Sequence, residues 1–189
     1  MQYLIDQARV FPARAAAHDV SLGAPAQSQQ PRAMFISCSD ARVVPALITA
    51  ARPGDLFELR TYGGVIPPYD PEAPTGESRT IEYAVDELGV SDIIVCGHSY
   101  CEVVTAALHD HLVASGIEAP SGGGWAPLTG DLTAAGHWHV LAQIDELSNH
   151  PCVVPRLADR SLRLHAWFHE IETGATLQYV SRANSFLPL

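Results

Sequence analysis

Short, nearly uninterrupted apolar runs mark the buried parts of this chain. Two of them cover residues 33–38 and 92–97, and a weaker third covers 56–59. A strand that is buried on both faces of a parallel sheet carries apolar side chains on both faces, so it shows no polar alternation. We therefore predict that these runs are strands of a mainly parallel sheet.

Apolar positions between and after these runs repeat at the spacing of a helix. In the first such segment they are followed by Gly89, which suits a helix C-terminus. A second helix is expected over residues 102–114 and a third over 134–149, where Pro151 stops it. Helices would therefore cover the sheet. The apolar face of the first helix consists of Ile81, Ala84, Val85 and Leu88.

The later part of the chain has a different pattern. Residues 162–168 and 175–180 flank the turn residues 172–174, which predicts a β-hairpin. The Gly- and Pro-rich stretch 120–127 predicts a loop. No internal repeat or domain boundary is visible. We therefore expect one α/β domain over residues 1–189, with a central, mainly parallel β-sheet flanked by helices and with hairpin strands near the C-terminus.

Composition disfavours several kinds of partner. The chain has 189 residues, of which 47% are hydrophobic, so one core can stabilise it without disulfides. Its formal net charge is −10 with only 11 Lys and Arg, whereas nucleic-acid binding depends on clustered basic residues. No run reaches membrane length, and residues 1–18 lack the apolar core of a secretion signal. We expect a cytoplasmic protein with no nucleic-acid or membrane partner.

Candidate metal ligands lie at the ends of two predicted strands. Cys38 closes the first run, His98 follows the second, and Cys101 comes at the start of the next predicted helix. Because ligands gather at the carboxyl ends of strands in an open α/β sheet, these side chains can converge on one ion. Two thiolates and one imidazole leave a fourth position free, which is typical of catalytic zinc. We therefore predict a Zn²⁺ site. The other two cysteines, Cys96 and Cys152, are expected to be buried thiols.

Asp40 and Arg42 stand beside the first of these ligands. Their spacing allows a charge-assisted and bidentate pair at the edge of the metal site. Arg42 would keep Asp40 ionised and away from the ion, so that Asp40 can accept a hydrogen bond from a zinc-bound water. The alternative is that the pair only anchors a loop.

Several motifs of the chain resemble those of the β-class carbonic anhydrases. The most specific are Cys-x-Asp-x-Arg at 38–42 and His-x-x-Cys at 98–101, and the segments 53–57, 81–85 and 164–174 are similar as well. The resemblance implies a zinc enzyme that interconverts carbon dioxide and bicarbonate by zinc-hydroxide attack, in a homodimer or higher homo-oligomer. It also implies that the three candidate ligands hold zinc and that Asp40 and Arg42 are catalytic. Residues 67–70 further resemble the plant-type branch.

The resemblance also implies a substrate pocket beside the zinc. The Gln, Phe and Tyr of the family pocket fall on Gln29, Phe57 and Tyr83. Gln29 could donate a hydrogen bond to a substrate oxygen, and Phe57 would form an apolar wall that suits a nonpolar gas. The other interpretation is that Phe57 and Tyr83 are core aromatics and that Gln29 is a solvated loop residue.

Two residues depart from the family pattern on the expected pocket wall. Tyr62 stands where the family has a small residue, and Glu102 stands where it has glycine. Tyr62 would fill volume, and Glu102 would repel bicarbonate or compete as a ligand, unless it points outward at the helix N-terminus. Three alternatives therefore stay open. They are a related zinc hydrolase acting on carbonyl sulfide, carbon disulfide or another small electrophile, a zinc-binding homologue without turnover, and a redox protein that uses Cys38 and Cys101.

Overall fold

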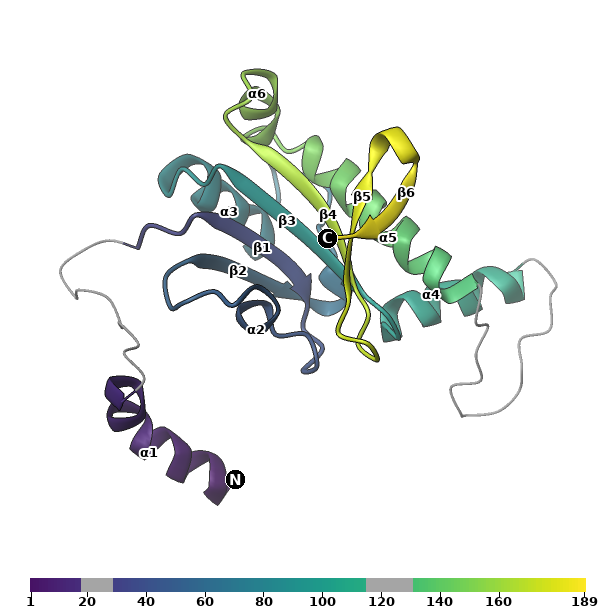
Figure 1. Ribbon diagram of the computed structural model, residues 1–189. Coiled ribbons are helices and arrows are strands. Elements are labelled where there is room, and N and C mark those ends of the chain that lie inside the picture. Colours follow the sequence, from purple (N-terminus) through teal and green to yellow (C-terminus); the bar gives the residue numbers. More distant parts are fainter. Residues whose placement is uncertain (18–28, 115–130) are drawn as a thin grey trace.

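The computed structural model describes residues 1–17, 29–114 and 131–189. A six-stranded sheet runs through it in the order β2-β1-β3-β4-β5-β6 (Figure 1). The strands β1 to β4 pair in parallel, and β5 and β6 are added antiparallel. This confirms the predicted mainly parallel sheet with its C-terminal hairpin. The strands are β1 (Ala33–Cys38), β2 (Leu56–Thr61), β3 (Asp92–His98), β4 (Arg163–His169), β5 (Thr176–Val180) and β6 (Ser185–Pro188).

Helices flank the sheet, as predicted. Helix α5 contacts β3 and β4, and in Figure 1 it passes behind β5 and β6. In the same view α1 lies apart from the sheet. The helices are α1 (Gln2–Ala17), α2 (Pro45–Thr49), α3 (Gly76–Glu82), α4 (Glu102–Ala114), α5 (Asp131–Ser148) and α6 (Val153–Ala158). Among the described residues, no helix combines the length and the apolar character that crossing a lipid bilayer requires.

The helix expected around Ile81–Leu88 starts earlier and changes its winding. Thr75 caps the N-terminus of α3, because its hydroxyl accepts a hydrogen bond from the amide of Ser78 at 3.1 Å. After Glu82 the chain continues as a π-helical segment (Tyr83–Glu87), and Gly89 then adopts a φ of 63°. Gly89 is therefore at the left-handed helix end that the sequence predicted.

The main core lies between the sheet and the helices that cover it. Side chains from β1 and β3 alternate between this core and a smaller cluster on the other face of the sheet, formed by Phe35, Ile94 and Cys96 with Leu56 and Trp167 packed against them. The first and third predicted helices contribute to the main core, whereas Val104 of α4 packs with Cys38 and Cys101 in a separate cluster. The buried members of the main core include Met34, Ile36, Ile81, Ala84, Val85, Ile93, Val95, Val140, Leu147, Ala166 and Phe168.

Four of the α-helices and strands of the fold were not predicted from the sequence, and one predicted loop falls on residues that the structure does not describe. The helices α1, α2 and α6 and the strand β6 were not expected from the sequence. The loop predicted at 120–127 lies outside the described residues. The site described below depends mainly on β1, β2, β3, the start of α4 and the hairpin between β4 and β5.

Candidate metal centre

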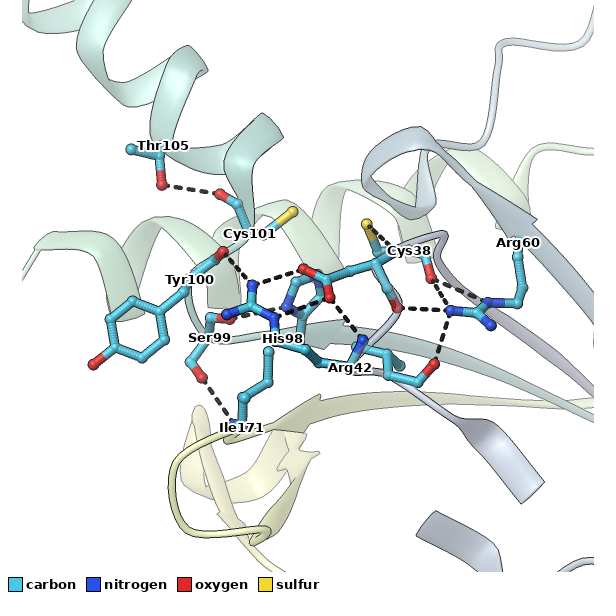
Figure 2. A network of polar contacts seen from close by, with 11 residues as sticks. Cys38, Arg42, Arg60, His98, Ser99, Tyr100, Cys101, Thr105 and Ile171 are labelled. Carbon is cyan, nitrogen blue, oxygen red and sulfur yellow. Dashed lines mark hydrogen bonds and ion pairs between the residues drawn. The ribbon is translucent and has the colours of Figure 1, made fainter. Parts of the chain in front are cut away.

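The three predicted ligands meet at the carboxyl end of the sheet. Cys38 is the last residue of β1, and His98 is the last residue of the neighbouring strand β3. Cys101 comes just before α4, and its carbonyl accepts the helix hydrogen bond from the amide of Thr105 at 3.0 Å. One ligand atom from each of the three residues lies within 4.8 Å of the other two. The parallel order of β1 and β3 therefore produces the convergence that the sequence predicted (Figure 2).

The cluster is buried, and its imidazole has the tautomer and the free atom that a ligand needs. The exposed fractions are 7% for Cys38, 2% for His98 and 5% for Cys101. His98 Nδ1 lies 2.8 Å from the carbonyl oxygen of Ser99, so Nδ1 carries the proton and donates it there. Nε2 is buried and has no hydrogen-bond partner in the described part of the chain. A metal ion at this lone pair accounts for an otherwise unsatisfied buried atom.

The electrostatics of the cluster also fit a divalent cation. Burial raises the pKa of the Cys101 thiol, although the amides of Val104 and Val103 partly offset this by hydrogen bonding to its sulfur. Burial likewise lowers the pKa of His98, which disfavours the imidazolium. Two thiolates in such a place need a positive charge, and a neutral imidazole can ligate it. Sulfur and nitrogen donors in this ratio suit Zn²⁺.

Asp40 and Arg42 form the expected pair beside Cys38. The Arg42 Nη2 atom lies 2.7 Å from Asp40 Oδ2, and Nε lies 3.0 Å from Oδ1. The amide of Arg42 also donates to Oδ1 at 2.9 Å. These bonds to Arg42 hold the pKa of Asp40 well below its usual range. Asp40 is therefore an ionised carboxylate whose orientation is fixed two residues after the metal ligand Cys38.

Contacts from the β4–β5 hairpin hold the loop that links His98 to Cys101. The amide of Ser99 donates to the His169 carbonyl at 3.0 Å, and its hydroxyl accepts from the amide of Ile171 at 2.9 Å. Tyr100 has a φ of 57°, and its hydroxyl donates to Glu172 at 2.6 Å. Sequence reasoning missed these contacts because the partners are far apart in the chain. Its only signal was the similarity of segment 164–174 to the family.

A short 3₁₀ turn (Tyr62–Gly64) closes the other side of the cluster. Gly64 has a φ of 68°, and a Cβ atom on it would lie 3.2 Å from the Cys38 amide nitrogen. His139 of α5 lies with Nε2 at 2.8 Å from the carbonyl of Gly63 and so holds the turn from behind. The close approach of this turn to Cys38 therefore requires glycine at position 64.

The predicted pocket residues fall into two groups. Phe57 and Tyr83 lie together, with ring centroids 5.8 Å apart; Phe57 packs against the main core, and Tyr83 is 44% exposed. Gln29, Tyr62 and Glu102 are exposed, with Tyr62 at 67% and Glu102 at the first position of α4. Each assignment to a substrate pocket stays a prediction.

Comparison with known proteins agrees with this geometry. Residues 33–120 match the carbonic anhydrase family model. The chain is 40% identical over 169 residues to a carbonic anhydrase of Pseudomonas aeruginosa, covering 79% of this chain and 73% of that one. Its fold superposes on the β-carbonic anhydrase CcaA with a TM-score of 0.78 at 32% identity, covering 100% of this chain and 92% of the other.

A second solved structure extends the likeness. One of two tetrameric β-carbonic anhydrases from the ascomycete Sordaria macrospora superposes with a TM-score of 0.76 at 25% identity, over 94% of this chain and 95% of that chain. The cluster of Cys38, His98 and Cys101 is typical of the zinc site of such proteins. The chain belongs to the β-class carbonic anhydrase family.

Proposed function

We propose that this protein is a zinc-dependent carbonic anhydrase that catalyses the reversible hydration of carbon dioxide to bicarbonate. The observation that carries the proposal is the buried cluster of Cys38, His98 and Cys101, whose ligand atoms lie within 4.8 Å of one another. Three protein ligands leave room for a fourth, which suits a catalytic rather than a structural ion. Membership of the family supports the same conclusion.

The chemistry divides between the ion and the protein. When bound, zinc acts as a Lewis acid and lowers the pKa of a coordinated water from about 15.7 towards about 7. Asp40 would accept a hydrogen bond from the attacking water, because an ionised carboxylate can accept but cannot donate. Arg42 holds that carboxylate through two of its nitrogen atoms and so prevents it from turning towards the open ligand position. The water would therefore present a lone pair to the substrate carbon.

The substrate would bind beside this centre against largely apolar residues. The ring pair of Phe57 and Tyr83 suits the wall of a pocket for a nonpolar gas, and Gln29 would donate a hydrogen bond to a substrate oxygen. The exposed position of Glu102 at the start of α4 favours an outward orientation, where the helix dipole stabilises its charge. Tyr62 is mostly exposed, which favours a place at the rim of the pocket rather than in its interior. Residues 67–70 favour the plant-type branch.

The assembly is proposed to be a homodimer or higher homo-oligomer of single-domain chains. Large apolar side chains on α1 are exposed in the single chain, which favours a partner surface. A tetrameric relative has a similar fold. The exposed apolar side chains of α1 are Tyr3, Leu4, Val10 and Phe11.

A cytoplasmic location is proposed on the composition of the chain.

One purified sample tests the proposal. Metal analysis should give one zinc per chain, and stopped-flow measurement should show hydration of carbon dioxide that stops when zinc is removed and returns when it is added back. Parallel assays with carbonyl sulfide and carbon disulfide separate the hydrolase alternative. A zinc-loaded protein with no hydration of carbon dioxide would contradict the proposal, whichever other substrate it turned over.

A further inference from the structure

Arg60 joins strand β2 to the loop that follows Cys38. In the sheet it pairs with Ser37, one position before the pair of Cys38 and Thr61. Its guanidinium donates to three backbone carbonyls of that loop (Figure 2). Nε and Nη2 lie 3.3 and 3.2 Å from the Cys38 oxygen, and Nη2 lies 2.7 Å from the oxygens of both Asp40 and Val43.

We propose that Arg60 is a positioning residue that fixes the zinc ligand Cys38 relative to the carboxylate of Asp40. Cys38 ends β1 and Asp40 lies two residues later on the loop that follows, and Arg60 binds the carbonyl of each. A shift of this loop would therefore change the distance between a metal ligand and the carboxylate that accepts a hydrogen bond from the attacking water. The inference rests on the proposed function, because it assigns a role within the same site.

Arg60 and Arg42 act on different parts of Asp40. Arg42 binds the side-chain carboxylate, whereas Arg60 binds the backbone carbonyl. Arg42 thus sets the rotation of the carboxylate, and Arg60 sets where its Cα lies relative to Cys38. Loss of Arg60 should therefore disturb the metal site even though the Asp40–Arg42 pair persists.

Other contacts hold the loop without Arg60, so its loss should not unfold the protein. The amide of Ser39 donates to the Thr61 carbonyl at 2.8 Å, and the amide of Val43 donates to the Asp40 carbonyl at 3.0 Å. The Arg60 side chain is itself exposed, so its hydrogen bonds compete with water and add little net stability. The role of Arg60 is therefore geometric more than energetic.

Only a guanidinium has the shape for this contact. It presents several N–H donors in a rigid plane, whereas a lysine ammonium is a compact charge on a flexible chain. Arg60→Lys keeps the charge but cannot reproduce the fork, and Arg60→Gln removes the charge as well. Comparison of the two variants separates shape from charge.

Arg156 provides a matched control elsewhere in the fold. Its guanidinium also donates to two backbone carbonyls, those of Val85 at 2.9 Å and Val90 at 3.3 Å, and to the hydroxyl of Ser161. It is more buried than Arg60, and these partners lie away from the metal ligands. Arg156→Gln should therefore cost at least as much stability as Arg60→Gln while leaving the metal site unchanged.

The experiment measures the metal site directly. Wild type, Arg60→Lys, Arg60→Gln and Arg156→Gln are loaded with Co²⁺, and their visible spectra report the ligand geometry. Zinc affinity is measured by competition with a chelator, and hydration of carbon dioxide by stopped flow. Both Arg60 variants should change the cobalt bands, weaken zinc binding by about 10-fold to 100-fold, and lower kcat more than they change KM.

Two results would overturn the proposal. One is a wild-type spectrum and wild-type zinc affinity in both Arg60 variants, and the other is an equal change in Arg156→Gln. If Arg60→Gln fails to fold, Arg60→Lys decides the question. If wild-type protein binds zinc but does not hydrate carbon dioxide, the proposed function fails, while the spectra and affinities still decide the role of Arg60.

Discussion

Arg42 holds Asp40 in a bidentate ion pair, with Nε 3.0 Å from Oδ1 and Nη2 2.7 Å from Oδ2. A second pair of the same geometry lies at the opposite end of the sheet, where Arg163 binds Asp92 at 2.7 Å through each of the same two nitrogen atoms. The first pair stands beside the metal ligand Cys38. The second joins the starts of β3 and β4. Breaking the Asp92–Arg163 pair is therefore a control for breaking the Asp40–Arg42 pair, because the geometry is the same and only the Asp40–Arg42 pair stands beside a metal ligand.

We expect Arg42→Gln to lower kcat/KM for carbon dioxide hydration by about 100-fold or more, which is the lower range for loss of a positioned acid or base. Without the guanidinium, Asp40 is free to rotate and to reach the open ligand position. Stopped-flow assays would measure the change, with Arg163→Gln as the control that breaks an equivalent pair away from the site. Equal activity of wild type and Arg42→Gln would remove Asp40 and Arg42 from the catalytic account.

The Asp92–Arg163 pair predicts a pH dependence of stability. Hydrogen bonding to Arg163 holds the pKa of Asp92 below its usual range. Such a carboxylate stabilises the fold above its unfolded pKa of about 3.9, and this contribution disappears as pH falls through the folded pKa. Arg163→Gln should therefore unfold at lower urea than wild type at pH 7, by the small amount typical of an exposed pair. The difference should shrink below about pH 4. An unchanged difference across this range would show that Asp92 is not its source.

Gly64 should be needed for metal binding as well as for folding. Gly64→Ala places a side chain at positive φ, which costs about 1–2 kcal/mol, and puts its Cβ against the backbone of Cys38. Gly89→Ala is the control, because Gly89 has a similar φ of 63° but nothing within 4 Å of its would-be Cβ. Both variants should lose stability in urea unfolding, and only Gly64→Ala should lose zinc affinity in chelator competition. Equal zinc affinity in the two variants would mean that the turn does not support Cys38.

Substitution of Cys38 and of Cys96 distinguishes the loss of a metal ligand from the loss of a buried thiol. Cys96 is 2% exposed, and burial raises the pKa of its thiol to about 12, so it stays protonated. Cys38→Ser should weaken zinc binding by at least about 100-fold. Loss of a group that only hydrogen-bonds to a metal ligand already lowers metal affinity by up to about 100-fold. Cys96→Ser should lower stability and leave the zinc content at one per chain. Zinc loss of the same size in both variants would show that the effect is general unfolding.

The sequence predicted those parts of the fold that depend on local apolar patterns. The strands β1 and β3 are continuous apolar runs because both faces of the sheet are covered there, and their residues are almost fully buried. Helix α4 has the predicted bounds of residues 102–114. The metal ligands could be predicted because Cys38 and His98 both end neighbouring parallel strands, so their convergence follows from topology.

The remaining features depend on contacts that no local pattern records. Helix α1 contains Pro12, a residue that disfavours the interior of a helix, so the sequence did not indicate it. The π-helical winding after Glu82 does not follow from the period of the apolar positions. The bonds of Arg60 to the loop after Cys38 span about 20 residues, and those of Tyr100 and Ser99 to the hairpin span 72. Such partners are visible only once the chain is folded.

X-ray absorption at the zinc edge of the purified protein tests the central claim most directly. We predict a first shell of two sulfur atoms at about 2.3 Å and two lighter atoms at about 2.0–2.1 Å, one from His98 and one from solvent. Cys38→Ser should remove one of the sulfur contributions. A shell of four sulfur atoms, or one with no sulfur, would contradict the account.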